Sequence, residues 1–340
     1  MTEISVKLCR QQDLDQTLIA DPNLAPTSVA GLELSNSLQT ASQGFLDIPG
    51  FSIRRKIGAG GMGIVYEALR LAENDAVAIK TIIPGKGTPK QAIDLFQREM
   101  QVLAALQHPH IVQFLGGGEF GGQIYLVMEY VDAVDAQALA KDMPVEQQTR
   151  LFCGIICQVL SALEYAHQLK LVHRDVKPRN ILVTKAGKTI SAKLADFGLA
   201  KNFEQAGLSQ LTADNEIRGT PAFMPWEQLQ NSRYAKPAAD LYSTAATLFF
   251  YLTGKLPGHT NPSGRANSTL GTLMGLLTRS NTEKPSASVI DGLSQLPDGL
   301  AEVLNRGLAS KPRDRFGTAD EMRTALLPFT RPPRNQQIVR

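Results

Sequence analysis

The chain carries the segment His173-Arg174-Asp175-Val176-Lys177-Pro178-Arg179-Asn180, followed at once by the apolar run Ile181-Leu182-Val183. A second acidic motif, Asp196-Phe197-Gly198, begins 21 residues after Asp175. Two carboxylates and a carboxamide therefore lie in loops beside apolar strands, where burial is costly unless they bind something. Hard oxygen ligands suit Mg²⁺, which takes a few protein oxygens together with phosphate oxygens. Asn180 and Asp196 would suffice for that, which leaves Asp175 to meet an acceptor hydroxyl.

A glycine-rich segment, Gly58-Ala59-Gly60-Gly61-Met62-Gly63-Ile64-Val65, lies near the start of the patterned region. Glycine lets backbone N–H groups approach an anion because no Cβ stands in the way. Strand-like residues flank this segment on both sides, whereas a dinucleotide fingerprint opens directly into a helix. The pattern favours a β-hairpin lid over phosphates. A glycine-rich hairpin without a ligand is the alternative.

A lysine ends the next apolar run, Val77-Ala78-Ile79-Lys80. A lysine in that position would lie at the edge of a cleft and would need an anion. Glu99 follows on the next expected helix, and a Lys80–Glu99 pair would hold the ammonium group toward phosphates. Taken alone, these two residues are better explained as an ordinary surface lysine and a helical glutamate.

Composition excludes several classes of protein. The 340 residues include 35 Lys and Arg against 32 Asp and Glu, a net charge of +3 that gives no reason to expect nucleic-acid binding or a polybasic membrane anchor. Three cysteines do not make a disulfide framework, which fits a reducing, intracellular setting. The first 25 residues hold scattered charges and no secretion signal. The longest uncharged stretches are shorter than the about 20 residues that a bilayer requires. We expect a cytoplasmic chain with no membrane segment.

The patterns divide the chain into three parts. Residues 1–48 are expected to form a flexible extension with little core, and residues 329–340 a short basic tail. From Phe51 on, short β-branched runs broken by glycine predict strands in hairpins. Beyond Pro144, helical spacing dominates, as in the recurrence every four residues from Leu151 to Leu163. Strands followed by a helix-rich remainder predict an α+β arrangement in two lobes.

Together these motifs resemble the eukaryotic-like Ser/Thr protein kinase family over residues 51–328, and the segment Gly219–Gln228 looks most like its bacterial branch. The resemblance implies a bilobal protein-kinase fold: a small β-rich N-lobe with one main helix at 51–130, and a larger, mostly helical C-lobe at 131–328. It implies ATP with Mg²⁺, for which Mn²⁺ could substitute. The implied substrates are Ser and Thr hydroxyls of proteins, the chain itself included, in signalling. A homodimer would serve such autophosphorylation.

The resemblance also implies roles for individual residues. Asp175 would orient and deprotonate the acceptor hydroxyl, Lys177 would stabilise the transferring phosphoryl group, and Glu99 would position Lys80. Mg²⁺ would be held by Asn180 and Asp196. The residues implied in nucleotide binding are Ile57, Gly58, Gly60, Gly61, Gly63, Val65, Ala78, Lys80, Met128 as gatekeeper, Glu129 and Val131 in the hinge, Asp135 at the ribose, and Leu182.

Regulation is implied by Arg174, which in this family marks kinases switched on by phosphorylation of the activation loop. The hydroxyls expected as phosphosites are Thr212, Ser209 and Thr220. Thr212 is the preferred one, because Thr220 matches a threonine that contacts the catalytic loop. The alternative is that these are ordinary polar loop residues in a constitutively ordered kinase.

Three further features complete the comparison with the family. The usual Ala/Pro-Pro-Glu tripeptide reads Pro225-Trp226-Glu227, which puts peptide preference in doubt, and Arg315 is the expected buried partner of Glu227. Asp240 resembles the aspartate that braces the catalytic-loop backbone. Cys153 and Cys157 are expected in the core, and His167 has no assigned role.

Two other functions are weighed against an active protein kinase. A pseudokinase would serve as a nucleotide-binding or scaffold module, but such proteins usually lose the equivalents of Lys80, Asp175 or Asp196, and all three are present. A small-molecule kinase of the same fold usually lacks both Lys177 and the Gly-Thr-Pro segment at 219–221.

Overall fold

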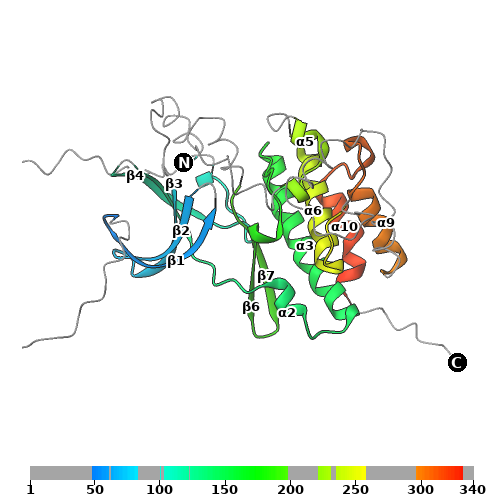
Figure 1. The fold of residues 1–340 in the computed structure, drawn as a ribbon, viewed down its shortest axis with the longest axis horizontal. Helices are drawn as coiled ribbons and strands as arrows, with labels where there is room; N and C mark the ends of the chain where they lie inside the picture. Colours follow the sequence, from blue (N-terminus) through cyan, green and yellow to red (C-terminus); the bar gives the residue numbers. More distant parts are fainter. Residues whose placement is uncertain are drawn as a thin grey trace, which may run out of the picture. The chain divides into compact units, whose positions relative to one another are not determined.

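The computed structural model describes residues 48–60, 63–82, 100, 103–121, 123–197, 221–230, 235–257 and 296–331. All of them belong to one compact unit of the chain, Leu46–Arg340. Within this unit, a β-sheet and a group of helices lie side by side, joined through a short connection after the last strand of the sheet (Figure 1). The expected extension before residue 48 and the tail beyond residue 331 lie outside the described residues.

The N-lobe is a five-stranded antiparallel sheet in the order β1-β2-β3-β5-β4. Its strands are β1 (Phe51–Gly60), β2 (Gly63–Arg70), β3 (Asp75–Ile82), β4 (Phe114–Phe120) and β5 (Gln123–Glu129). The polar turn between β2 and β3 places Asn74 at φ 55°, a left-handed conformation that asparagine tolerates better than most residues. The hairpins predicted from the glycine-broken runs are therefore present.

The N-lobe core includes one residue that the sequence placed in the flexible extension. Ile48 is only 1% exposed and packs with Ala68, Val77, Ile79 and Val127. The chain then turns through Gly50 at φ 85°, and the Gly50 carbonyl accepts a hydrogen bond from the Leu71 N–H at 2.9 Å. The N-lobe core therefore begins at Ile48 and not at Phe51. The sequence did not indicate this, because a single apolar side chain beyond a glycine turn gives no periodic signal.

The C-lobe is built around α3 (Val145–Gln168), which lies against α6 (Pro237–Thr253), α10 (Ala319–Leu326) and the hairpin of β6 (Ile181–Ala186) and β7 (Thr189–Leu194). The other α-helices of the described residues are α2 (Ala136–Ala140), α5 (Trp226–Gln230) and α9 (Asp298–Gly307). Short 3₁₀ turns are η1 (Pro178–Asn180), η2 (Pro221–Phe223), η4 (Pro312–Asp314) and η5 (Leu327–Thr330). Among the described helices, none has the length and apolar character needed to cross a membrane.

Local sequence explains where the two central helices begin and end. Proline precedes the first residue of α3 and is the first residue of α6, positions where its missing N–H costs nothing. Helix α6 ends at Gly254, which adopts φ 69° without a Cβ penalty. The predicted face of α3 is buried, including Ile155, Val159 and Leu163. Cys153 and Cys157 are buried on the same helix, as expected.

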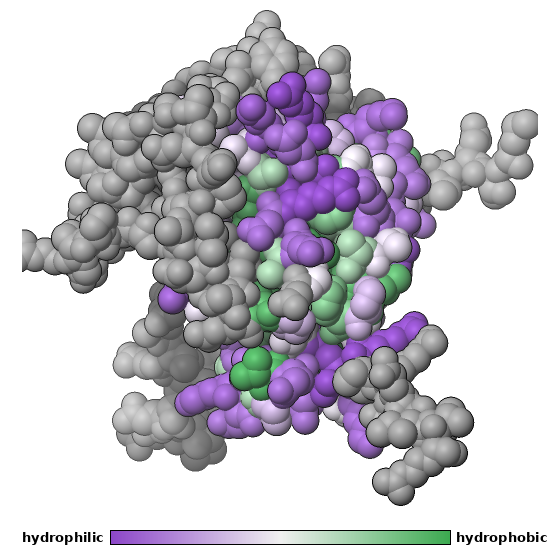
Figure 2. All heavy atoms as spheres, turned by 90° about the vertical axis from the view of Figure 1, so that its right-hand side faces the viewer, coloured by the Kyte–Doolittle hydropathy of each residue, from purple (hydrophilic) through white to green (hydrophobic). Residues whose placement is uncertain are grey.

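The outer helices are amphipathic. Figure 2 shows the helical side of the described unit, where hydrophilic residues prevail around smaller apolar areas. In α9, Leu300 and Leu304 point into the core, and Arg306 forms an exposed ion pair with Glu321 of α10 at 2.6 Å. Such surface pairs contribute about 0–1 kcal/mol, so packing of the apolar faces holds these helices in place.

Close packing of α9 on α6 leads to a prediction about stability. A Cβ at Gly307 would lie 2.6 Å from the Cβ of Ala245, so Gly307→Ala forces the two helices apart. Gly307 is the last residue of α9, where the helix-propensity gain of alanine is small. Overpacking should therefore prevail and lower the free energy of unfolding by about 1–3 kcal/mol, measured by urea denaturation.

The matched control is Gly154→Ala in the interior of α3, where a Cβ meets nothing within 4 Å. This substitution should raise the free energy of unfolding by about 0.5–1 kcal/mol, because alanine favours the helix over glycine. Equal effects of the two substitutions would contradict the packing argument.

Candidate active site

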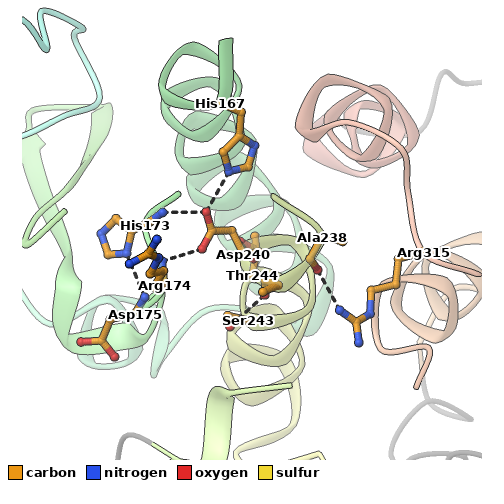
Figure 3. A network of polar contacts seen from close by, with 10 residues as sticks. His167, His173, Arg174, Asp175, Ala238, Asp240, Ser243, Thr244 and Arg315 are labelled. Atoms are coloured by element: carbon orange, nitrogen blue, oxygen red, sulfur yellow. Dashed lines mark hydrogen bonds and ion pairs between the residues drawn. The ribbon is translucent and has the colours of Figure 1, made fainter. Parts of the chain in front are cut away.

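One buried carboxylate holds the backbone of the loop at residues 173–175. Asp240, in the first turn of α6, accepts hydrogen bonds from the His173 N–H at 2.8 Å and the Arg174 N–H at 2.7 Å (Figure 3). Its Oδ2 also accepts a hydrogen bond from His167 Nε2 at 2.8 Å. The Asp240 side chain is 0% exposed, and burial of a carboxylate is costly unless such partners are in place. The loop conformation is thus tied to the burial of Asp240.

Two residues next to this network have strained backbones. Arg174 has φ 68° and Asp196 has φ 60°, both in the left-handed region that residues with a Cβ rarely occupy. Each such conformation costs about 1–3 kcal/mol and persists only where the surroundings determine it. His173 supplies one of the restraints on Asp196, since its Nε2 donates to the carbonyl of Ala195 at 2.8 Å. Both strained residues belong to the motifs that the sequence singled out.

The Asp175 carboxylate lies in a cluster of its own, pointing away from Asp240 in Figure 3. Asn180 Nδ2 donates to the Asp175 carbonyl at 2.8 Å and to Asp175 Oδ2 at 3.0 Å. Lys177 Nζ lies 2.8 Å from the same Oδ2. Because both hydrogen bonds of Asn180 use its nitrogen, its carboxamide oxygen faces away from Asp175. The three residues therefore present a fixed carboxylate, an ammonium group and an amide oxygen.

Lys80 crosses from the sheet to the C-lobe. Its Nζ lies 2.9 Å from Asp196 Oδ1, and its side chain is only 6% exposed. Burial would raise the pKa of Asp196, but Lys80, with smaller contributions from His173 and Lys177, holds that pKa below its usual value. Asp196 follows Ala195, whose N–H donates to the Asn180 carbonyl at 2.8 Å, so the two charged clusters lie close together. Glu99, the expected partner of Lys80, lies outside the described residues, and that pair stays a prediction.

The glycine-rich segment is a β-hairpin beside this lysine. Gly58 pairs with Val65 across β1 and β2, and Val65 pairs in turn with Lys80 on β3. Gly63 has φ 141°, a conformation that a Cβ disfavours. Gly60 ends β1, while Gly61 lies outside the described residues. The segment thus belongs to two paired antiparallel strands and not to the strand–helix unit of a dinucleotide fold.

The remaining sequence-predicted residues lie on strands of both lobes and in the connection between the lobes. Met128 pairs with Ala78 across β3 and β5 and lines a small pocket with Phe114, Phe197 and Asp196. Ile57 is exposed on β1, Val131 lies just past β5, and Leu182 is half-buried on β6.

Two acidic residues of this connection have structural partners. Glu129 Oε1 contacts Lys193 Nζ at 2.6 Å and accepts the Gln113 N–H at 2.8 Å. Asp135 Oδ1 caps the N-terminus of α2 by accepting N–H groups of Gln137 and Ala138. These contacts orient the connection, and the expected contact of Asp135 with a ribose stays a prediction.

The expected ion pair of Glu227 and Arg315 is present. Arg315 is 1% exposed at its side chain and contacts both carboxylate oxygens of Glu227, at 2.6 and 3.1 Å. It also donates to the Ala238 carbonyl at the start of α6, at 2.9 Å (Figure 3). This bidentate pair anchors α5, which begins at Trp226, to the C-lobe core. The expected phosphosites Ser209, Thr212 and Thr220 lie outside the described residues.

Sequence reasoning gave no role to three residues that contact the site. His167 bonds to Asp240, Lys193 bonds to Glu129, and Gln228 donates to the carbonyl of Arg174. A single histidine, lysine or glutamine on an element carries no signal in one sequence. Only the tertiary contacts identify them.

Comparison with known proteins now adds independent evidence. A model of the protein kinase domain matches residues 51–327. The chain belongs to the protein kinase family. The serine/threonine-protein kinase PknF of Mycobacterium tuberculosis is 36% identical over 287 residues, which cover 82% of this chain and 56% of PknF. PknH of the same organism is 32% identical over 275 residues, which cover 81% of this chain and 41% of PknH. The chain thus spans about half the length of these relatives.

A solved structure agrees with the family. The kinase domain of Mycobacterium tuberculosis PknI superposes with a TM-score of 0.58 at 29% sequence identity, covering 84% of this chain and 98% of that domain. The bilobal kinase fold expected from the sequence is therefore confirmed, with the β-rich lobe first and the helical lobe second.

The Lys80–Asp196 contact predicts a change of pKa. In Lys80→Met, burial of Asp196 is no longer offset by the ammonium group at 2.9 Å, so the pKa of Asp196 should rise. The wild-type carboxylate stays ionised to lower pH than that of the variant. NMR titration of the labelled Asp196 carboxyl carbon in the nucleotide-free chain measures the difference.

Lys193→Met is the matched control, since Lys193 contacts Glu129. It should leave the titration of Asp196 unchanged. If Lys80→Met also left it unchanged, Lys80 would not be the cause of the lowered pKa.

Proposed function

We propose that the chain is an ATP-dependent protein serine/threonine kinase, which transfers the γ-phosphate of ATP to Ser and Thr hydroxyls of proteins. One observation carries the proposal: Lys80 of β3 contacts Asp196, and the loop of Asp196 adjoins the loop of the Asp175–Lys177–Asn180 cluster. The two loops are tied together by the Ala195 N–H, which donates to the Asn180 carbonyl at 2.8 Å. Two ammonium groups, two carboxylates and an amide oxygen are thus gathered beside a glycine-rich hairpin.

The residues of this site would act mainly by position and charge, as phosphoryl transfer requires little covalent work from the protein. Lys80 would hold phosphate oxygens. Asp175, already fixed by Asn180, would accept a hydrogen bond from the acceptor hydroxyl and take its proton. Lys177 would stabilise charge on the transferred group, because its ammonium lies within ion-pair distance of Asp175.

The nucleotide would lie under the hairpin. Gly58, Gly60, Gly61 and Gly63 would cover the phosphates, and the adenine would lie between the apolar residues of the two lobes, namely Ile57, Val65, Ala78 and Leu182. Its polar edge would meet backbone groups of Glu129 and Val131. Met128, at the back of this space, would limit its depth.

The donor set also fits a divalent cation. Asn180 turns its carboxamide oxygen away from Asp175, and the lowered pKa keeps Asp196 ionised, so two oxygen ligands are available near the phosphate-binding lysine. Mg²⁺, with Mn²⁺ as a substitute, is the proposed ion. Bound there, it would neutralise charge on phosphate oxygens.

The proposal extends to the bounds of the domain, its autophosphorylation and its location in the cell. The catalytic domain would span residues 51–328, between the extension and the tail. Two copies would meet for autophosphorylation, with Thr212 as the preferred site and Arg174 as the group that pairs with the new phosphate. A cytoplasmic location is proposed from the cysteine usage and charge pattern of the sequence.

The proposal is tested by transfer of labelled γ-phosphate from ATP and Mg²⁺ to a generic basic protein and to the chain itself. Asp175→Asn should lower the transfer rate by about 10²–10⁴-fold, the usual contribution of a general base. It should leave nucleotide binding intact, because Asp175 is not among the residues proposed to bind ATP.

Asp320→Asn is the matched control, because it makes the same chemical change in an exposed pair with Arg323 on α10. It should transfer phosphate at the wild-type rate. Binding of nucleotide without transfer by the wild-type chain would reject the kinase and favour a pseudokinase scaffold. Label on tyrosine would reject the proposed acceptor class.

A further inference from the structure

Gln228 connects the end of the activation segment to the catalytic loop. It lies in α5 directly after Glu227, and its side chain is buried, with the residue only 1% exposed. Its Nε2 donates to the carbonyl oxygen of Arg174 at 2.6 Å. The family comparison and the sequence assigned no role to this residue.

This contact completes the restraint of a strained peptide. Asp240 accepts from the Arg174 N–H on one side, and Gln228 donates to the Arg174 carbonyl on the other. Arg174 itself has φ 68°, a conformation that its surroundings must hold. The Arg174 carbonyl belongs to the peptide unit whose nitrogen is that of Asp175. A hydrogen bond to that carbonyl therefore fixes the plane of the Arg174–Asp175 peptide, and with it the direction of the Asp175 side chain.

The orientation of the Gln228 amide follows from its partner. A carbonyl oxygen only accepts, so the atom that faces Arg174 must be the nitrogen, and Oε1 points away. Among the described residues, no donor contacts this buried Oε1. The hydrogen bond to Arg174 is therefore the side-chain contact of Gln228 on which the inference rests.

The neighbour of Gln228 explains what its contact could transmit. Arg315 holds Glu227 and so fixes the position of α5. Gln228, the next residue of α5, contacts the catalytic loop at the Arg174 carbonyl. We propose that Gln228 is a positioning residue, which couples the anchoring of α5 to the orientation of Asp175. The inference rests on the proposed kinase activity and deepens it, because it identifies how the activation segment would act on the catalytic loop.

The first test compares Gln228→Leu with the wild-type chain, using labelled phosphate transfer to a generic basic protein. The variant loses the donor to Arg174 but also removes the unpaired Oε1, so its melting temperature should stay within about 2 °C of the wild type. The kcat should fall by about tenfold, which one lost hydrogen bond of average strength accounts for. The KM for ATP should change less than twofold, because the proposed nucleotide contacts lie elsewhere.

A matched control makes the same substitution at an equivalent hydrogen bond. Gln148 Nε2 donates to the Met143 carbonyl at 2.8 Å near the start of α3, remote in sequence and contacts from the catalytic loop. Gln148→Leu should keep the wild-type kcat.

The second test uses Gln228→Glu, which keeps the shape of the side chain. Burial against a carbonyl oxygen, with Glu227 next in sequence, raises the pKa of the new carboxyl group, and its protonated form can donate to Arg174 as the amide does. The kcat of Gln228→Glu relative to wild type should therefore rise by about tenfold from pH 9 to pH 6. The same ratio for Gln228→Leu should be flat, because leucine does not titrate.

These results separate the inference from the function on which it rests. An inactive wild-type chain overturns both. An active wild type with a Gln228→Leu variant that is folded and within twofold in kcat overturns the inference alone, as does a loss that appears in the KM for ATP. If Gln228→Leu does not fold, the pH ratio of Gln228→Glu decides: a rise toward low pH supports the inference, and a flat ratio overturns it.

Discussion

The burial of the Asp240 carboxylate is the constraint on which the rest of the site depends. A charge that is 0% exposed must be matched by donors, and it takes them from the backbone of His173 and Arg174 and from the ring of His167. Loss of these hydrogen bonds would leave a buried carboxylate without donors, which is costly. This cost holds Arg174 in its left-handed conformation. Groups of the C-lobe core therefore hold the loop at residues 173–175 in place.

Further hydrogen bonds and ion pairs connect this loop to both lobes. His173 and Asn180 bond to Ala195 and so place Asp196, which meets Lys80 from the sheet at 2.9 Å. On the other side, Arg315 joins α5 to the start of α6, the helix that carries Asp240. Elements far apart in sequence thus meet at two short loops. Electrostatic preorganisation of this kind is the main means by which phosphoryl transfer is catalysed.

Much of this could be predicted from the sequence, because the motifs combine local pattern with fixed order. The hairpin at Gly58–Val65, the helix α3 and the Glu227–Arg315 pair all follow from residues in recognisable positions. What the sequence could not provide is which partner a side chain chooses in three dimensions. The contact of Lys80 with Asp196 was not predicted from the sequence, and the predicted Lys80–Glu99 pair stays a prediction. His167 and Gln228 act through single hydrogen bonds, and Ile48 through one buried side chain, none of which leaves a periodic pattern.

We expect the loop at residues 173–175 to be arranged before nucleotide binds. Amide hydrogen exchange of the ligand-free chain tests it directly, because the N–H groups of His173 and Arg174 are those bound to Asp240. Both should exchange as slowly as the core amides of α6, and addition of ATP and Mg²⁺ should change their rates little. Exchange as fast as that of an exposed loop, slowed only when nucleotide is added, would contradict it.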